Sequence, residues 1–277
     1  MEPLYIILII VASVIVLIGI WALTEPHILD MTDVSLPDKD VAGEGGGLRL
    51  FFFSDLHGEF CFISPARLCA QIDKANEEGR LDAVVFGGDI ATRKMFGSAG
   101  ARYLKKISQH CKEIGIPFYG VLGNHDTLLP RVQINECGFT DIGGTYVEIE
   151  VANGRKYVLA GVTDSGRKHR VWHQMPEVPE GLPVVCLVHD PDALLHFGKK
   201  PDYALCGHLH GGQVKMPFHL EFVLLRHDEL PKRGVIEGVH VIEGVPTFIS
   251  RGIGCGALPI RLLSLPEASV VETGGYR

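Results

Sequence analysis

The sequence predicts an α/β fold of two packed mixed β-sheets flanked by helices, preceded by one transmembrane helix. Three observations lead to this prediction. The 277-residue chain opens with an uncharged apolar run, apolar strand-like runs then alternate with helical stretches, and the second half adds strands in hairpin fashion. Strand–helix alternation is typical of parallel sheets and hairpins are typical of antiparallel ones, so both kinds of pairing are expected.

The apolar run from Leu4 to Leu23 contains no charged residue. A helix of about 20 residues spans the roughly 30 Å hydrocarbon core of a bilayer. A secretory signal peptide would begin with basic residues and end at a small-residue cleavage site, whereas this chain begins with Glu2 and offers a poor site between Trp21 and Thr24. A core helix that is apolar on every side would be unusual in a domain of this size. We therefore expect residues 1–24 to be a single-pass membrane anchor.

The segment after this helix, residues 25–46, is predicted to be a linker because it ends in a glycine-rich run, and residues 47–277 are predicted to form the folded domain. No Lys or Arg precedes the apolar run, whereas Lys39 and Arg49 follow it. The seven cysteines include no CxxC pair and suggest free thiols in a reducing compartment. Both features favour a domain on the cytoplasmic side of the membrane.

The charge balance limits the partners. The chain carries a net charge of −7 and a pI near 6.0. Sequence-independent binding of nucleic acid needs a basic face, so no nucleic-acid partner is expected. An anionic substrate would have to be attracted by a local site.

Local patterns place the individual elements of the domain. A helix is expected from Pro65, with Ser64 as its N-cap, to just before Gly79, and a second from about Ala99 to Glu113. A short helix is expected to start at 190–191, and a hairpin turn is expected at 153–154. Strands are predicted at 48–53, 83–86, 118–122, 146–151, 156–162, 184–188, 203–206, 213–216, 247–250 and 269–272.

Side chains that can bind a metal ion follow five of these strands. Each motif alone is weak evidence, because Gly-Asp and Gly-Asn-His sequences usually mark turns. Their conjunction at five strand ends is more specific, since the ends of neighbouring strands bring ligands together. Carboxylates and imidazoles suit Mn, Fe, Zn and similar ions. The residues are Asp55, His57, Asp89, Asn124, His125, His189, His208 and His210.

In this order the motifs resemble those of the calcineurin-like metallophosphoesterase family, over roughly residues 47–270. The segments 189–192, 207–213 and 250–254 are also similar to a membrane-associated bacterial subfamily. That subfamily includes phosphodiesterases and an enzyme that cleaves UDP-2,3-diacylglucosamine in lipid A synthesis. Leu209 stands where Thr is often found between the two histidines, and because it is not a ligand we expect little effect.

The resemblance implies an αββα sandwich with two divalent ions, Mn first and Fe, Zn or Mg as alternatives. It implies that Asp89 bridges the ions and that His125, outside the ligand set, is the catalytic residue that faces the leaving-group oxygen. Two carboxylates neutralise half of the charge of two divalent ions, so the centre would still attract a phosphoryl anion. Arg251 is a candidate contact for phosphate or a head group, or else a structural salt bridge. By resemblance the first ion takes Asp55, His57 and His210, and the second takes Asn124, His189 and His208.

The function expected from this pattern is hydrolysis of a phosphodiester or pyrophosphate bond, in a substrate linked to lipid, since the anchor would confine the enzyme to the bilayer. A phosphomonoesterase or protein phosphatase is one alternative. A non-catalytic metal-binding scaffold is another, although the complete ligand set and His125 argue against it. A dinucleotide-binding module is disfavoured because no GxGxxG follows the first strand.

Overall fold

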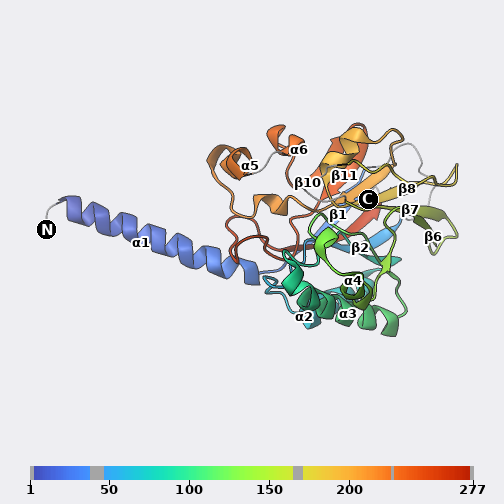
Figure 1. Ribbon diagram of the computed structural model, residues 1–277, viewed down its shortest axis with the longest axis horizontal. Helices are drawn as coiled ribbons and strands as arrows, with labels where there is room; N and C mark the ends of the chain where they lie inside the picture. Colours follow the sequence, from blue (N-terminus) through green and yellow to red (C-terminus); the bar gives the residue numbers. More distant parts are fainter. Residues whose placement is uncertain (1–2, 38–46, 165–170, 226–227, 275–277) are drawn as a thin grey trace.

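A computed structural model describes residues 3–37, 47–164, 171–225 and 228–274. Within this part of the chain, two six-stranded sheets pack face to face with helices outside them (Figure 1). This confirms the predicted fold class. The first sheet has the order β1 (Asp30–Leu36), β12 (Glu267–Thr273), β2 (Arg49–Phe53), β3 (Ala83–Phe86), β4 (Phe118–Gly120) and β5 (Thr140–Asp141).

The second sheet is parallel at its centre and antiparallel at both edges. Its order is β10 (Gly238–Ile242), β11 (Val245–Ile249), β9 (Tyr203–Cys206), β8 (Val184–Val188), β7 (Lys156–Val162) and β6 (Tyr146–Glu150). β6 and β7 form the predicted hairpin, and β10 and β11 form a second one. In the first sheet only the β12–β2 pair is antiparallel, so both sheets are mixed.

The alternation of side chains along β2 shows how the layers are held together. Leu50 and Phe52 point into the core between the sheets, whereas Phe51 and Phe53 point outward to the helices. α2 (Pro65–Glu78), α3 (Gly97–Glu113) and α4 (Arg131–Glu136) cover that outer face. The outer face of the second sheet is covered by the 3-10 helix η4 (Pro191–His196) and by α6 (Glu229–Lys232), with α5 (Leu220–Leu225) beside them.

The predicted capping signals are confirmed in the structure. The Ser64 hydroxyl accepts a hydrogen bond from the backbone N–H of Arg67 at 3.2 Å, and Pro65 opens α2. Gly79 is the C-cap of the same helix. Short 3-10 helices complete the connections: η1 (Glu25–His27), η2 (Lys94–Phe96), η3 (Asp126–Leu128), η5 (His210–Gly212) and η6 (Pro217–His219).

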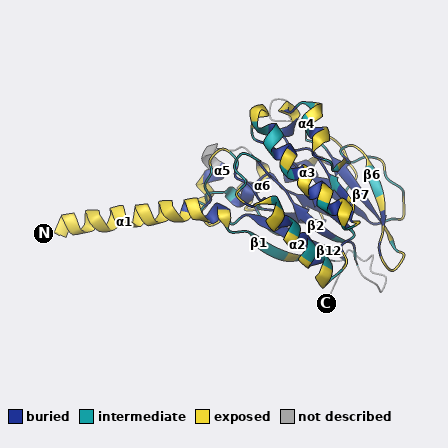
Figure 2. Ribbon diagram, turned by 90° about the horizontal axis from the view of Figure 1, so that it is seen from below, coloured by how far each residue is buried: buried dark blue, intermediate teal, exposed yellow. Residues whose placement is uncertain are grey.

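The N-terminal helix α1 (Pro3–Thr24) extends away from the domain (Figures 1 and 2). Its most apolar window has a mean hydropathy of 3.2, yet only 6% of that window is buried. A helix of this length and composition could cross a membrane, and its exposed apolar surface is otherwise unfavourable in water.

Two of the sequence predictions differ from the structure. Within the predicted linker 25–46, residues 30–36 form β1, which pairs in parallel with β12 and closes the edge of the first sheet. The sequence Asp-Met-Thr-Asp-Val-Ser gives only a weak apolar alternation, because most of its side chains are exposed or only partly buried. Residues 38–46, with most of the glycine run, lie outside the described part. The predicted strand at 213–216 is reduced to one bridge between Val214 and Leu262.

Candidate metal centre

The predicted ligands lie in loops that leave the ends of five strands, as expected for parallel strands that finish at one edge. The backbone of these loops is unusual. Five of the predicted ligands have a positive φ, which non-glycine residues seldom adopt: Asp55, His57, Asp89, His208 and His210, with values from 39° to 72°. Such conformations cost of order 1–3 kcal/mol each and gather at functional sites. The chain therefore holds these side chains in place at the expense of backbone strain.

The first group of ligands consists of Asp55, His57 and His210, all buried. The Nε2 atoms of His57 and His210 lie 3.1 Å apart, and the Nε2 of His210 lies 3.3 Å from Oδ1 of Asp55. Two imidazole nitrogens and a carboxylate oxygen thus converge on one point. The Nδ1 of His57 lies 3.0 Å from the hydroxyl of Thr92, which orients the ring from behind.

The second group consists of Asp89, His189 and His208. The Nε2 of His189 lies 3.3 Å from Oδ2 of Asp89 and 3.3 Å from Nδ1 of His208. On its other side, Nδ1 of His189 faces the carbonyl oxygen of Gly87 at 2.7 Å. A carbonyl only accepts, so Nδ1 carries a proton and Nε2 is the nitrogen that faces the other ligands.

Asp89 connects the two groups. Its Oδ2 lies 3.6 Å from Nε2 of His57 and 3.3 Å from Nε2 of His189. Its Oδ1 accepts a hydrogen bond from the backbone N–H of His125 at 3.0 Å. One carboxylate therefore faces both groups of imidazoles while being fixed by the loop that carries Asn124 and His125.

Asn124 provides a test of whether the site suits a cation. Its side chain is 5% exposed, and neither its amide oxygen nor its amide nitrogen has a hydrogen-bond partner in the described structure. A buried amide without a partner costs roughly 1–3 kcal/mol. A cation bound at the amide oxygen would remove part of this cost, so the chemistry of the residues fits a metal ion.

The ionisation of the buried groups depends on this crowding. Burial would raise the pKa of Asp89, but the imidazoles around it, His189 foremost, lower it well below the usual range. Burial would lower the pKa of His189, but the Asp89 carboxylate raises it well above its usual value. Burial lowers the pKa of His57 to about 3 and raises that of Asp55. His57 is thus neutral at physiological pH, which is the state that binds metal.

Comparison with known proteins agrees with this geometry. Residues 48–212 match the sequence model of the family described as Calcineurin-like phosphoesterase. The chain belongs to the calcineurin-like phosphoesterase family. Two relatives are from Bacillus subtilis and are named as uncharacterized metallophosphoesterases. YkoQ is 28% identical, over 85% of this chain and 87% of YkoQ. YkuE is 27% identical, over 89% of this chain and 86% of YkuE. The Escherichia coli protein named Phosphodiesterase YaeI is 25% identical and covers 81% of both chains.

This membership makes the chain a metal-dependent phosphoesterase, a hydrolase of phosphate esters that uses divalent metal ions. The broader family resemblance inferred from the motifs is confirmed. The narrower resemblance to enzymes that cleave UDP-2,3-diacylglucosamine stays a prediction.

In this phosphoesterase, His125 lies at the edge of the first ligand group. Its ring meets that of His57 edge-on, with 5.3 Å between centroids, and it is only half-buried. Its Nδ1 lies 3.0 Å from the carbonyl oxygen of Thr92, so Nδ1 carries the proton there.

Several residues that support the ligands were not predicted from the sequence. The buried Asp126 carboxylate accepts hydrogen bonds from three backbone N–H groups, those of Asp89 at 2.8 Å, Ile90 at 2.7 Å and Gly123 at 2.9 Å. It ties the loop after β3 to the loop after β4. Burial and the charge of Asp89 raise the pKa of Asp126, and the N–H donors of Gly123 and Ile90 oppose that rise. The Asp of the Gly-Asn-His-Asp motif was the available signal.

His208 has carboxylates behind it. Its Nε2 lies 3.4 Å from Oδ1 of Asp228 and 3.8 Å from Oδ2 of Asp190, and all three side chains are buried. A carboxylate on the far nitrogen fixes the tautomer and strengthens a histidine as a ligand. Asp190 follows His189 directly, but nothing in the sequence marks Asp228 as a neighbour of His208, because the two are far apart along the chain.

Arg251 forms the salt bridge that was the alternative to a substrate contact. Its Nη2 donates to Asp30 at 2.6 Å and to Glu267 at 2.9 Å. These partners attach β1 and the start of β12 to the loop after β11. They raise the pKa of Arg251 despite its partial burial. The structure therefore gives Arg251 a structural role, and its contact with substrate stays a prediction.

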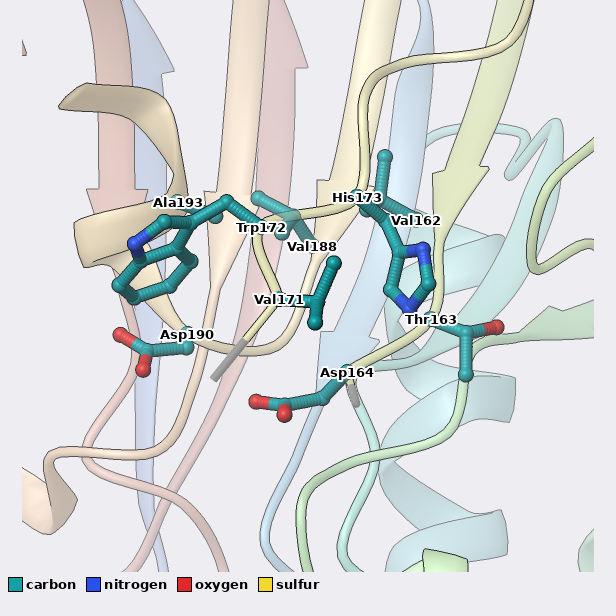
Figure 3. A pocket seen from close by; sticks show the side chains of 9 residues that line it. All are labelled: Val162, Thr163, Asp164, Val171, Trp172, His173, Val188, Asp190 and Ala193. Atoms are coloured by element: carbon teal, nitrogen blue, oxygen red, sulfur yellow. The ribbon is translucent and has the colours of Figure 1, made fainter. Parts of the chain in front are cut away.

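A pocket flanks the second ligand group (Figure 3). It encloses about 290 Å³, including its open mouth, and is lined by apolar side chains such as Val162 and Val188 together with Trp172, Asp164 and Asp190. In Figure 3 the two carboxylates lie in the lower part of the view, Asp190 below Trp172 and Asp164 below Val171. Since Asp190 also faces His208, the pocket adjoins the second ligand group.

Proposed function

We propose that this phosphoesterase uses two divalent ions to hydrolyse a phosphodiester or pyrophosphate bond in a lipid-linked substrate at a membrane. Asp89 would hold both ions from between the two groups of ligands. The rest of the ligand set is assigned as Asp55, His57 and His210 for the first ion, and Asn124, His189 and His208 for the second. His125 is assigned to the leaving group.

One observation carries the two-ion assignment. Oδ2 of Asp89 faces Nε2 of His57 at 3.6 Å and Nε2 of His189 at 3.3 Å. A carboxylate shared between two groups of imidazoles is the arrangement that a binuclear centre requires. A single-ion site would need only one of these groups. Nitrogen and oxygen donors without thiolates are compatible with Mn, Fe, Zn or Mg, and Mn is our first assignment.

When bound, a pair of divalent ions supplies Lewis-acid activation of the phosphoryl group and lowers the pKa of bound water. The protein residues supply the remaining steps. His125 keeps a proton on Nδ1 through the Thr92 carbonyl, so an additional proton resides on Nε2 in the imidazolium form. That Nε2 proton passes to the leaving alkoxide when the P–O bond breaks, and the neutral ring then takes a proton back from water. Losing a general acid of this kind typically costs 10²–10⁴-fold in rate.

The preference for a diester is supported by the E. coli relative, whose name describes a phosphodiesterase. The lipid-linked substrate is supported by α1, which would hold the site near a bilayer surface. The domain is assigned to the cytoplasmic side, since all seven cysteines are free thiols.

The experiment that tests this function compares substrate classes on the full-length enzyme in detergent with added Mn. Bis-p-nitrophenyl phosphate, p-nitrophenyl phosphate and a UDP-linked lipid are assayed in parallel. We expect the diester or the pyrophosphate to be hydrolysed at least tenfold faster than the monoester. The reverse order would make the enzyme a phosphomonoesterase. His125→Ala tests the site. His110→Ala is the matched control, since Nε2 of His110 pairs with Oδ1 of Asp73 at 2.7 Å and His110 is not one of the ligands.

A further inference from the structure

The C-terminal end of α1 is attached to the domain by defined hydrogen bonds. The carbonyl oxygen of Ala22 accepts from the backbone N–H of Arg261 at 3.0 Å. The carboxylate of Glu25, which is 1% exposed, accepts from the backbone N–H groups of Leu263, at 2.9 Å, and Ser264. The helix therefore leaves the domain from one fixed place, beside the loop 258–264.

Exposed apolar side chains surround this place, and we call them the juxtamembrane patch. Phe218 is 92% exposed and Leu263 is 67% exposed. The segments that carry the patch lie side by side. The backbone N–H of Lys215 donates to the carbonyl oxygen of Leu262 at 3.0 Å. The ring of Phe62 lies against that of His27, just after α1, with 4.5 Å between ring centroids. Figures 1 and 2 both show α5 at the end of the domain from which α1 leaves. The patch consists of Phe62, Met216, Phe218, Leu220, Leu258 and Leu263.

Two members of the patch are held in a strained backbone conformation. Phe218 and Leu263 both have a φ of 59°, a region that bulky residues rarely occupy. The strain at Leu263 is maintained by its hydrogen bond to Glu25, the first residue after α1. A protein gains nothing in water from backbone strain that presents a large apolar side chain to solvent, so the conformation points to an apolar environment outside the domain.

The patch also lies next to the metal centre. A Cβ added to Gly256 would lie 3.8 Å from Nε2 of His210, and Leu258 is two residues further along. Two residues of chain span at most about 7 Å. Gln213 fixes this loop, because its side chain accepts from Gly256 N–H at 2.7 Å and donates to the carbonyl of Leu258 at 2.9 Å.

We propose that the juxtamembrane patch rests on the surface of the bilayer that α1 crosses, with Phe218, Leu258 and Leu263 inserted among the lipid head groups and upper acyl chains. The inference depends on the membrane anchor of the proposed function. A helix that spans the bilayer brings the face from which it emerges against the lipid, and that is the face with the exposed apolar side chains. The edge of the metal centre at Gly256 then lies close to the level of lipid phosphates.

The test measures depth in the membrane with the full-length protein in phosphatidylcholine–phosphatidylglycerol vesicles that contain acyl-chain-brominated lipid, a contact quencher of tryptophan. Trp21 and Trp172 are replaced by Phe, and single tryptophans are introduced as Phe218→Trp or Leu258→Trp. The matched control is Ala152→Trp, an exposed residue at the tip of the β6–β7 hairpin. The native Trp21, measured in a Trp172→Phe background, reports whether α1 is in the bilayer.

We expect quenching at 218 and 258 to be at least threefold stronger than at 152 and comparable with that at Trp21. Phe218→Trp changes a residue with a positive φ and could therefore alter the loop conformation. Leu258→Trp provides a second position without this risk, since Leu258 does not have a positive φ. If Trp21 is quenched while 218 and 258 match 152, the patch does not touch the bilayer and the anchor stands. If Trp21 is not quenched, the anchor and the patch both fail, while hydrolysis of soluble diesters by the metal centre is unaffected.

Discussion

The Asp126 carboxylate holds the two loops that carry Asp89, Asn124 and His125, and Asp126→Asn should therefore damage both folding and metal binding. The carboxylate receives three N–H groups on two oxygens, two on Oδ2 and one, from Ile90, on Oδ1. An asparagine can place its oxygen at the Oδ2 position and keep two of these bonds. Its amide nitrogen then faces the N–H of Ile90, so that two donors meet in a buried site.

The size of the effect follows from these contacts. A hydrogen bond contributes about 0.5–1.5 kcal/mol, and a buried donor left without an acceptor costs about 1–3 kcal/mol. We expect a loss of about 2–4 kcal/mol in the free energy of unfolding. At roughly 2–4 °C per kcal/mol for a chain of this size, Tm should fall by on the order of 10 °C. Changing a partner of a metal ligand typically weakens metal affinity by about 10–100-fold.

Scanning calorimetry measures the first quantity and titration calorimetry with Mn²⁺ measures the second. Asp141→Asn is the matched control, since Asp141 is a half-buried carboxylate that accepts a single backbone N–H, that of Gly143, at 2.9 Å. This control should lower Tm by no more than about 3 °C, by the same scaling. By the same scaling, a Tm within about 2 °C of the parent would mean almost no loss of stability. An Asp126→Asn variant with such a Tm and unchanged Mn²⁺ affinity would show that Asp126 does not organise the site.

Three further predictions concern the ligands, the N-terminal segment and the thiols. Asp89→Asn should lose at least one metal ion, whereas His125→Ala should keep its metal and lose about 10²–10⁴-fold in rate. The loss of rate should be smaller for p-nitrophenolate esters than for alkyl esters, and loss of metal from His125→Ala would show that His125 is a ligand. A chain that begins at Ala22 should stay folded, whereas one that begins at Gly45 lacks β1 and should melt at a lower temperature, which thermal unfolding of both will compare. Burial raises the pKa of Cys111, Cys137 and Cys186 to about 12. These thiols should therefore resist a disulfide reagent at pH 8 in the native protein and react with it in denaturant, and rapid labelling of the native protein would contradict their burial.

Much of the site could be predicted from the sequence, because each ligand follows an apolar strand in a motif of its own. The structure brings Asp55, His57, Asp89, His189, His208 and His210 into two adjacent groups, as the motif order suggested. Neighbouring parallel strands end at the same edge of a sheet, so the positions of these residues at strand ends predicted that they lie close together. The individual roles in catalysis stay predictions until variants are measured.

The remaining features depend on contacts that local sequence does not encode. β1 was mistaken for linker because its alternation is weak and its partner, β12, lies more than two hundred residues away. The carboxylate of Asp228 reaches His208 only through the packing of α6 on η4, which Asp192 fixes by accepting the N–H groups of Glu229 and Leu230. The salt bridge of Arg251 likewise depends on β1 being in the sheet.

The binuclear assignment is tested most directly by the number of metal ions that the enzyme needs for turnover. The full-length protein is freed of metal with a chelator, and Mn²⁺ is added back in steps while bound metal per chain and hydrolysis of bis-p-nitrophenyl phosphate are followed together. A binuclear centre bridged by Asp89 predicts no turnover without metal and full turnover at two ions per chain. Full activity in excess chelator, or activity that is complete at one ion per chain, would contradict it.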